Sequence, residues 1–198
     1  DDNYALMTLR LLLTFGNSVE EALDAVVSSF TQHCTILGYQ VKVLATRNFT
    51  AGEYLSCRFY PVGGELVVGK KPGRVLTKIG ALMANEREPQ RSLEYWKGSL
   101  LSYLPTANHV PFLRKYIAVC LDKLVGVQAR FAAETKYRLQ GRLYEADDST
   151  WAAFIDVYGA LANEDSELDF EYELRNKPLN YMHNFEVLDV LFRLDFEM

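Results

Sequence analysis

Residues 38–74 constrain the fold most, because strand-like runs alternate there with turn-forming residues. GYQVKV (residues 38–43) alternates apolar and polar side chains, which is typical of a half-buried strand. YLSCRFY (residues 54–60) and LVV (residues 66–68) are separated by PVGG (residues 61–64). Because proline and glycine interrupt regular structure, the two runs around this break predict a β-hairpin.

A basic segment, GKKPGR (residues 69–74), follows the predicted hairpin. Its proline and two glycines predict a loop rather than a helix. The loop carries Lys70, Lys71 and Arg74, and phosphate groups are the natural partners of such cations. The alternative is a solvated turn without a ligand, and the sequence leaves both open.

The net charge of −5 conceals an uneven distribution along the chain. Residues 42–97 and residues 98–142 each carry a surplus of five positive charges, whereas residues 143–198 carry a net charge of −11. A basic middle indicates an anionic partner, and the acidic end would repel it. We expect the acidic part either to face away from such a partner or to dock onto a basic protein surface.

Helical periodicity organises most of the remaining chain. Ser18 and Glu21 form a capping-box pattern. The apolar residues that follow recur at helical spacing, which predicts an amphipathic helix ending near Gly38. Five or six further helices are expected after residue 74. The sequence therefore predicts an α+β fold, with a small antiparallel sheet and hairpin followed by a mostly helical region.

The sequence gives no support for several classes of protein. Cys34, Cys57 and Cys120 match no zinc spacing, and their odd number favours free thiols in a reducing compartment. No apolar run approaches the roughly 20 residues that span a bilayer, and no signal peptide is recognisable. The sequence contains no nucleophile-elbow, Walker or dinucleotide-binding motif.

This order of elements, with these residues, resembles the C-terminal part of a viral RNA-dependent RNA polymerase. The similarity is to enzymes of positive-strand RNA viruses of the tombusvirus-like and nodavirus-like group. Asp1-Asp2 resembles the aspartate pair of the family's motif C, residues 18–43 resemble motif D, and EYLSCRF (residues 53–59) resembles motif E. The match rests on motifs over residues 1–80 and on helical character alone over residues 81–198.

The resemblance implies a palm C-terminal part at residues 1–68 and a helical thumb at residues 69–198. The glycine that precedes the two aspartates in the family, the fingers, the first metal-binding motif and the nucleotide-selecting motif have no counterpart in this sequence. We therefore expect a fragment, or one chain of a polymerase divided between polypeptides. The chain also begins without methionine, in keeping with that expectation.

By resemblance, the chain belongs to an enzyme that adds ribonucleotides to an RNA 3′ end by two-metal nucleotidyl transfer. Asp1 and Asp2 would be the metal ligands, and Mg²⁺ or Mn²⁺ the cofactor. Lys42 would be the general acid for the departing pyrophosphate. The competing interpretations are an exposed acidic terminus for the aspartates and an edge-strand lysine for Lys42.

The resemblance also assigns an RNA-binding surface. Cys57 and Arg58 would support the 3′ end of the nascent strand, and Lys70, Lys71 and Arg74 would contact RNA phosphates. The implied partners are the RNA template and nascent strand, ribonucleoside triphosphates, and the remaining polymerase segment or a companion chain. The implied location is the host cytoplasm, at viral replication complexes.

A second hypothesis belongs to a different class of protein. The chain would be a non-catalytic α+β interaction module that binds RNA or an acidic protein through its basic middle. The polymerase hypothesis requires Asp1 and Asp2 to lie close to Lys42 and to the hairpin that carries Cys57. The module hypothesis does not require that proximity.

Overall fold

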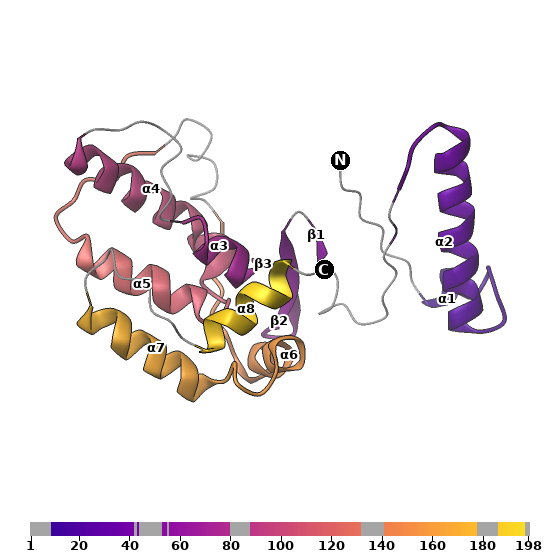
Figure 1. Cartoon of the computed structure of the whole chain (residues 1–198). Helices are drawn as coiled ribbons and strands as arrows, with labels where there is room; N and C mark the ends of the chain where they lie inside the picture. The colour runs from indigo at the N-terminus through magenta and orange to yellow at the C-terminus, as the bar shows by residue number, and fades with distance from the viewer. Residues whose placement is uncertain are drawn as a thin grey trace. The chain divides into compact units, whose positions relative to one another are not determined.

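A computed structural model of the chain describes residues 9–41, 43, 53–54, 56–79, 88–131, 141–177 and 186–196. The chain divides into two compact units, Asp1–Tyr54 and Leu55–Met198. Figure 1 shows a short and a long helix in the first unit, and a β-hairpin beside several helices in the second unit.

The first unit contains α1 (Leu9–Leu12), α2 (Val19–Ile36) and β1 (Glu53–Tyr54). The predicted N-cap is confirmed, because the Ser18 hydroxyl accepts the Glu21 backbone N–H at 3.2 Å. The Glu21 carboxylate accepts the Asn17 backbone N–H at 3.1 Å. The predicted glycine at the helix end is also confirmed, since Gly38 adopts φ +83°, in the left-handed region.

The strand predicted at residues 38–43 is wrong for the residues that the structure describes there, 38–41 and 43, because none of them lies in a strand. The backbone N–H groups of Gly38 and Tyr39 donate to Thr35 and Cys34, so the first two residues complete the end of α2. Tyr39 and Val41 are exposed. The alternating pattern is therefore not the mark of a buried sheet face at this position.

The predicted hairpin is confirmed in the second unit. β2 (Cys57–Val62) and β3 (Glu65–Lys70) pair antiparallel, with Phe59 opposite Val68. The turn consists of Gly63 at φ +58° and Gly64 at φ +81°. Two consecutive left-handed residues are what the favoured two-residue hairpin turn requires, and glycine adopts them without steric cost.

The loop predicted at residues 69–74 is wrong. Lys70 ends β3, Lys71 is an N-cap, and α3 (Pro72–Leu76) begins immediately after it. Proline at the first helical position is favourable, because its missing N–H has no partner there in any helix and its φ is already helical. Pro72, which favours a loop in the sequence pattern, is thus the first residue of a helix.

The helices that complete the second unit are α4 (Pro89–Ala107), α5 (Leu113–Lys123), α6 (Asp148–Tyr158), α7 (Glu164–Asn176) and α8 (Glu186–Phe196). The N-cap of α6 is Asp147, which forms a capping box with Thr150. The prediction of an α+β fold, with a small antiparallel sheet and a mostly helical remainder, is confirmed.

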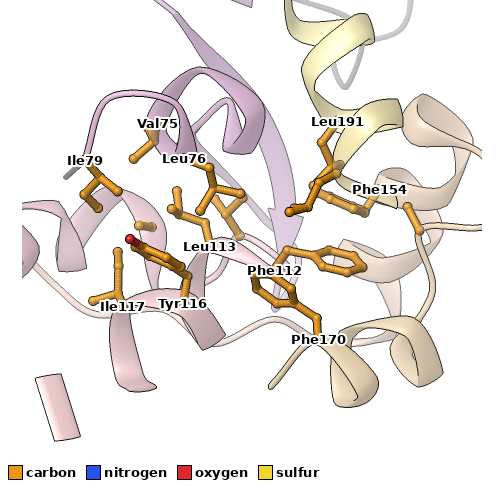
Figure 2. Packing of buried hydrophobic residues seen from close by; sticks show 14 of the residues in the cluster. Val75, Leu76, Ile79, Phe112, Leu113, Tyr116, Ile117, Phe154, Phe170 and Leu191 are labelled. Atoms are coloured by element: carbon orange, nitrogen blue, oxygen red, sulfur yellow. The ribbon is translucent and has the colours of Figure 1, made fainter. Parts of the chain in front are cut away.

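One hydrophobic core joins the hairpin to the helices of the second unit. Figure 2 shows Phe112 of the turn before α5 lying against Phe154 of α6 and Phe170 of α7. The ring centroid of Phe112 lies 5.9 Å from that of Phe154 and 5.7 Å from that of Phe170. Tyr60 of β2 belongs to the same core. The hairpin is therefore part of the helical unit, whereas the expected domain boundary after residue 68 placed it with the first part.

Gly98 provides a stability test of the packing of α4. A Cβ atom at this position would lie 1.9 Å from the backbone oxygen of Arg130, whose N–H donates to Glu94 of α4 at 2.9 Å. Overpacking costs about 1–3 kcal/mol, and alanine regains about 1 kcal/mol of helix propensity over glycine. We therefore expect Gly98→Ala to lower the free energy of unfolding in urea, with Ser99→Ala, on the exposed side of α4, as the neutral control. A variant as stable as Ser99→Ala would contradict this close approach.

Candidate functional site

A buried carboxylate at the end of α8 gathers polar groups from three other elements. The Asp195 Oδ1 atom accepts the Tyr158 hydroxyl at 2.7 Å and lies 3.6 Å from an Arg58 Nη atom. The Oδ2 atom accepts the backbone N–H of Gly73 at 2.7 Å. Arg58 is 2% exposed and Asp195 is fully buried. We call this set, with Lys71 and Arg74, the Asp195 cluster.

The secondary structure explains how these groups meet. Arg58 lies opposite Gly69 in the β2–β3 register, on the hairpin face that also carries the buried Tyr60. Gly73 is at the start of α3, where backbone N–H groups lack helical partners. The N-cap of α3, Lys71, forms no side-chain cap. The Asp195 carboxylate therefore caps α3 from a distant part of the chain.

The hydroxyl of Tyr158 bridges the acid and the base of the cluster. Arg58 Nε donates to it at 3.2 Å, and the guanidinium lies 5.4 Å from the centre of the Tyr158 ring. Burial raises the pKa of Asp195, while the Tyr158 hydroxyl, the Gly73 amide and the cations Arg58 and Lys71 oppose that rise. Burial likewise raises the pKa of Tyr158. The phenol therefore acts as a neutral hydrogen-bond donor to the carboxylate.

Arg74 lies at the more exposed side of the cluster and contacts the last turn of α8. Its Nε donates to the backbone oxygen of Asp195 at 2.8 Å, and a terminal nitrogen donates to the Ser56 hydroxyl at 3.4 Å. Its guanidinium lies 5.2 Å from the centre of the Phe196 ring. Arg74 is half-buried. It therefore joins the last turn of α8 to the segment before β2.

The structure places the five predicted RNA-binding residues differently from the exposed loop that was expected. Cys57, Arg58 and Lys71 are buried, with Lys71 only 1% exposed, and Lys70 and Arg74 are half-buried. Arg58, Lys71 and Arg74 come together around Asp195, whereas Cys57 and Lys70 form the neighbouring strand pair. In this conformation the side chains of Cys57, Arg58 and Lys71 are not accessible to a ligand. The sequence pattern missed this because Asp195 lies more than 100 residues from the three cations.

Asp1 and Asp2 are the predicted metal ligands, and Lys42 is the predicted general acid. Asp1, Asp2 and Lys42 lie outside the described residues. Within the described ranges, no group of three or more His, Cys, Asp or Glu residues is arranged to hold a metal ion. The roles of Asp1, Asp2 and Lys42 therefore stay predictions.

Glu167 is a second buried carboxylate that sequence reasoning did not identify. It accepts the backbone N–H of Phe112 at 2.7 Å, and it accepts both Nε and a terminal nitrogen of Arg114, at 2.9 and 2.6 Å. Phe112 has φ +63°, which is uncommon for a residue with a side chain. The bidentate pair fixes the start of α5 against α7 and is structural. No local spacing announces it, because 53 residues separate Arg114 from Glu167.

Asp147 connects the hairpin turn to α6. Its carboxylate accepts the Ser149 hydroxyl, the backbone N–H of Gly63 at 2.6 Å and that of Thr150 at 3.0 Å. These hydrogen bonds, that from Ser149 first, lower the pKa of Asp147 well below its usual value. The carboxylate is therefore ionised at neutral pH, and it orients the tip of the hairpin.

His109 is a fully buried histidine packed against aromatic rings. Its ring centre lies 5.7 Å from that of Tyr60 and 6.1 Å from that of Tyr144. Neither ring nitrogen has a hydrogen-bond partner of good geometry in the described part, although the Val68 carbonyl lies near enough to favour a proton slightly. Burial lowers the pKa of His109 from 6.5 to about 4. The imidazole is therefore neutral at pH 7.

This burial predicts a loss of stability in acid. Between pH 4 and 6.5 the unfolded chain binds a proton at His109 that the folded chain does not, so stability is complete above pH 6.5 and falls as the pH is lowered. A fall in pKa from 6.5 to about 4 corresponds to about 3 kcal/mol. We expect the Tm of the wild type to decrease more steeply than that of His109→Gln over this range. Parallel Tm profiles for the two proteins would contradict the prediction.

No described helix is both long enough and apolar enough to cross a membrane. In comparisons with protein-family models, with curated proteins and with solved structures, none matches this chain.

Proposed function

We propose that the chain is the palm end and thumb of a viral RNA-dependent RNA polymerase. The observation that carries the proposal is the order of elements. An amphipathic helix, α2, is followed by the β2–β3 hairpin and then by α3 to α8. This is the order of the motif D helix, the motif E hairpin and the helical thumb in the family that the sequence resembles.

The proposed chemistry rests on Asp1, Asp2 and Lys42. Carboxylate oxygens are hard ligands of the kind that Mg²⁺ prefers, and an adjacent pair provides them on one turn. Mg²⁺, when bound, would activate the attacking hydroxyl and stabilise the triphosphate. Asp1 and Asp2 would hold the ions, and Lys42 would protonate the departing pyrophosphate.

The first unit exposes many apolar side chains, which supports the proposal that another protein surface covers it. Only Leu12 and Ala22 are buried among its described apolar residues. Seven large apolar side chains of this unit are exposed by about half or more: Leu9, Leu11, Phe15, Phe30, Ile36, Leu37 and Tyr39. A small unit that exposes so many large apolar side chains is a candidate for contact with another protein surface. We propose that the remaining polymerase segment, or a companion chain, covers it.

A second candidate function is the non-catalytic interaction module. The second unit favours it, because its hairpin and helices share one core that includes Tyr60, Leu113, Phe154 and Leu191. A unit with its own core has the anatomy of an independent domain. In this case RNA or an acidic protein would be its partner, and Asp1 and Asp2 would have no catalytic role.

Photo-crosslinking with the position of the reactive base varied separates the two functions. A single 4-thiouridine is placed either at the 3′ end or in the interior of an RNA primer annealed to a template. With the longest natural form of the protein, the polymerase predicts crosslinks from the 3′-terminal base to residues 53–76, and far fewer from the interior base. Equal yields from both positions would favour the module, and the absence of crosslinks in the hairpin would contradict the placement of RNA there.

A further inference from the structure

The Asp195 cluster has the composition of an anion-binding site in which the anion, the Asp195 carboxylate, comes from the same chain. Arg58, Lys71 and Arg74 contribute three positive charges, and Asp195 contributes one negative charge. The groups that meet its carboxylate are a backbone N–H, a phenol and a guanidinium. These are also the donors that bind phosphate oxygens in protein–RNA interfaces.

α8 is the element that brings this ligand into place. Among the described elements it packs mainly on α3 and to a lesser extent on α6. Leu188 and Leu191 are buried, and Figure 2 shows Leu191 directed toward Phe154. Val190, Phe192 and Leu194 are partly buried and pack against the same core. Phe196, at the last turn, is 48% exposed beside Arg74. The helix contacts the cations through its last turn, where Asp195 and Phe196 lie.

We propose that α8 is a displaceable internal ligand, and that Asp195 occupies a phosphate site of Arg58, Lys71 and Arg74 that binds the RNA backbone when α8 moves away. The inference rests on the proposed function, because it supplies the RNA contact that the buried side chains otherwise lack. The closed arrangement reduces the apparent affinity for RNA by the fraction of molecules in which the site is open. Removing the charge of Asp195 raises that fraction.

The test is the affinity of the full chain for a fluorescent single-stranded RNA of 12 nucleotides, measured by anisotropy. Asp195→Asn keeps an oxygen that accepts the Gly73 N–H but removes the competing charge. We expect RNA affinity to rise about tenfold at low salt. The dependence of log K on log salt should steepen by about two, from three additional phosphate contacts at about 0.7 each.

Asp189→Asn is the matched control, because Asp189 is exposed on the same helix and its replacement changes the net charge equally. An affinity for RNA equal in the two variants would overturn the inference. Adding Arg58→Gln to Asp195→Asn should abolish the gain, whereas a gain that persists would also overturn it.

Phe196→Ala keeps the inference testable if Asp195→Asn fails to fold by circular dichroism. This variant removes the ring beside Arg74 without changing the buried carboxylate, and we expect a smaller rise in RNA affinity, about twofold. No rise would overturn the inference.

Nucleotide incorporation by the longest natural form separates the two proposals. Incorporation with unchanged RNA affinity of the variants removes only the role of α8, and tighter RNA binding without incorporation removes only the polymerase.

Discussion

Replacing Asp1 and Asp2 together with alanine should abolish nucleotide incorporation by the intact enzyme. If the two carboxylates hold the catalytic ions, their loss removes several kcal/mol of transition-state stabilisation. Because each 1.36 kcal/mol is a factor of ten in rate, the expected decrease is about 10³-fold or more. The measurement is template-dependent incorporation of a labelled nucleotide in the presence of Mg²⁺, with the longest natural form of the protein.

The matched control is the pair Asp165→Ala and Asp169→Ala, which removes two exposed carboxylates of α7. This control should keep the rate of incorporation, and neither double variant should shift Tm by more than a few degrees. Retained incorporation in the Asp1/Asp2 variant would contradict a catalytic role. A large fall in its Tm would indicate a structural role instead.

Replacing Glu167 with alanine should be among the most destabilising substitutions in the second unit. It would leave the Arg114 guanidinium and the Phe112 N–H without their shared acceptor. Removing one partner of a buried ion pair costs about 3–5 kcal/mol. Because Arg114 is 24% exposed, water compensates part of that loss, and we expect about 3 kcal/mol from urea unfolding. For a chain of this size this corresponds to a decrease in Tm of about 6–12 °C.

Two further variants of the same helix define what Glu167 does. Glu164→Ala removes an exposed acid from the first turn of α7, and its effect should stay within about 0.5 kcal/mol. Glu167→Gln keeps an acceptor for the Phe112 N–H but loses the charge, so its stability should lie between those of the wild type and Glu167→Ala. Equal stability of the Glu164 and Glu167 alanine variants would contradict a structural ion pair.

Local chemistry explains which elements were predictable from the sequence. Gly63 and Gly64 specify a hairpin turn because both adopt positive φ, and Ser18 specifies a helix start because its hydroxyl satisfies a free N–H. The strand prediction at residues 38–43 is wrong for the described residues 38–41 and 43, and the loop prediction at residues 69–74 is wrong. At the first, the backbone completes the end of α2, and at the second, Pro72 begins a helix instead of preventing one.

The buried ion clusters were not predictable, because their partners are distant in the chain. The sequence alone indicates a basic surface at Arg58, Lys71 and Arg74. In the structure, Asp195 lies beside these three cations. A run of cations in a sequence identifies a charge but not the side of the fold on which it lies. The proposed catalytic residues, Asp1, Asp2 and Lys42, rest on the family resemblance and remain predictions.

Nucleotide incorporation tests the central claim most directly. The longest natural form of the protein, with any polypeptide that co-purifies, would be incubated with an RNA template, the four ribonucleoside triphosphates and Mg²⁺, and the labelled product would be resolved by length. The polymerase predicts template-length RNA that depends on Mg²⁺. A folded preparation that binds RNA yet yields no product with any template or primer would contradict the polymerase and favour the interaction module.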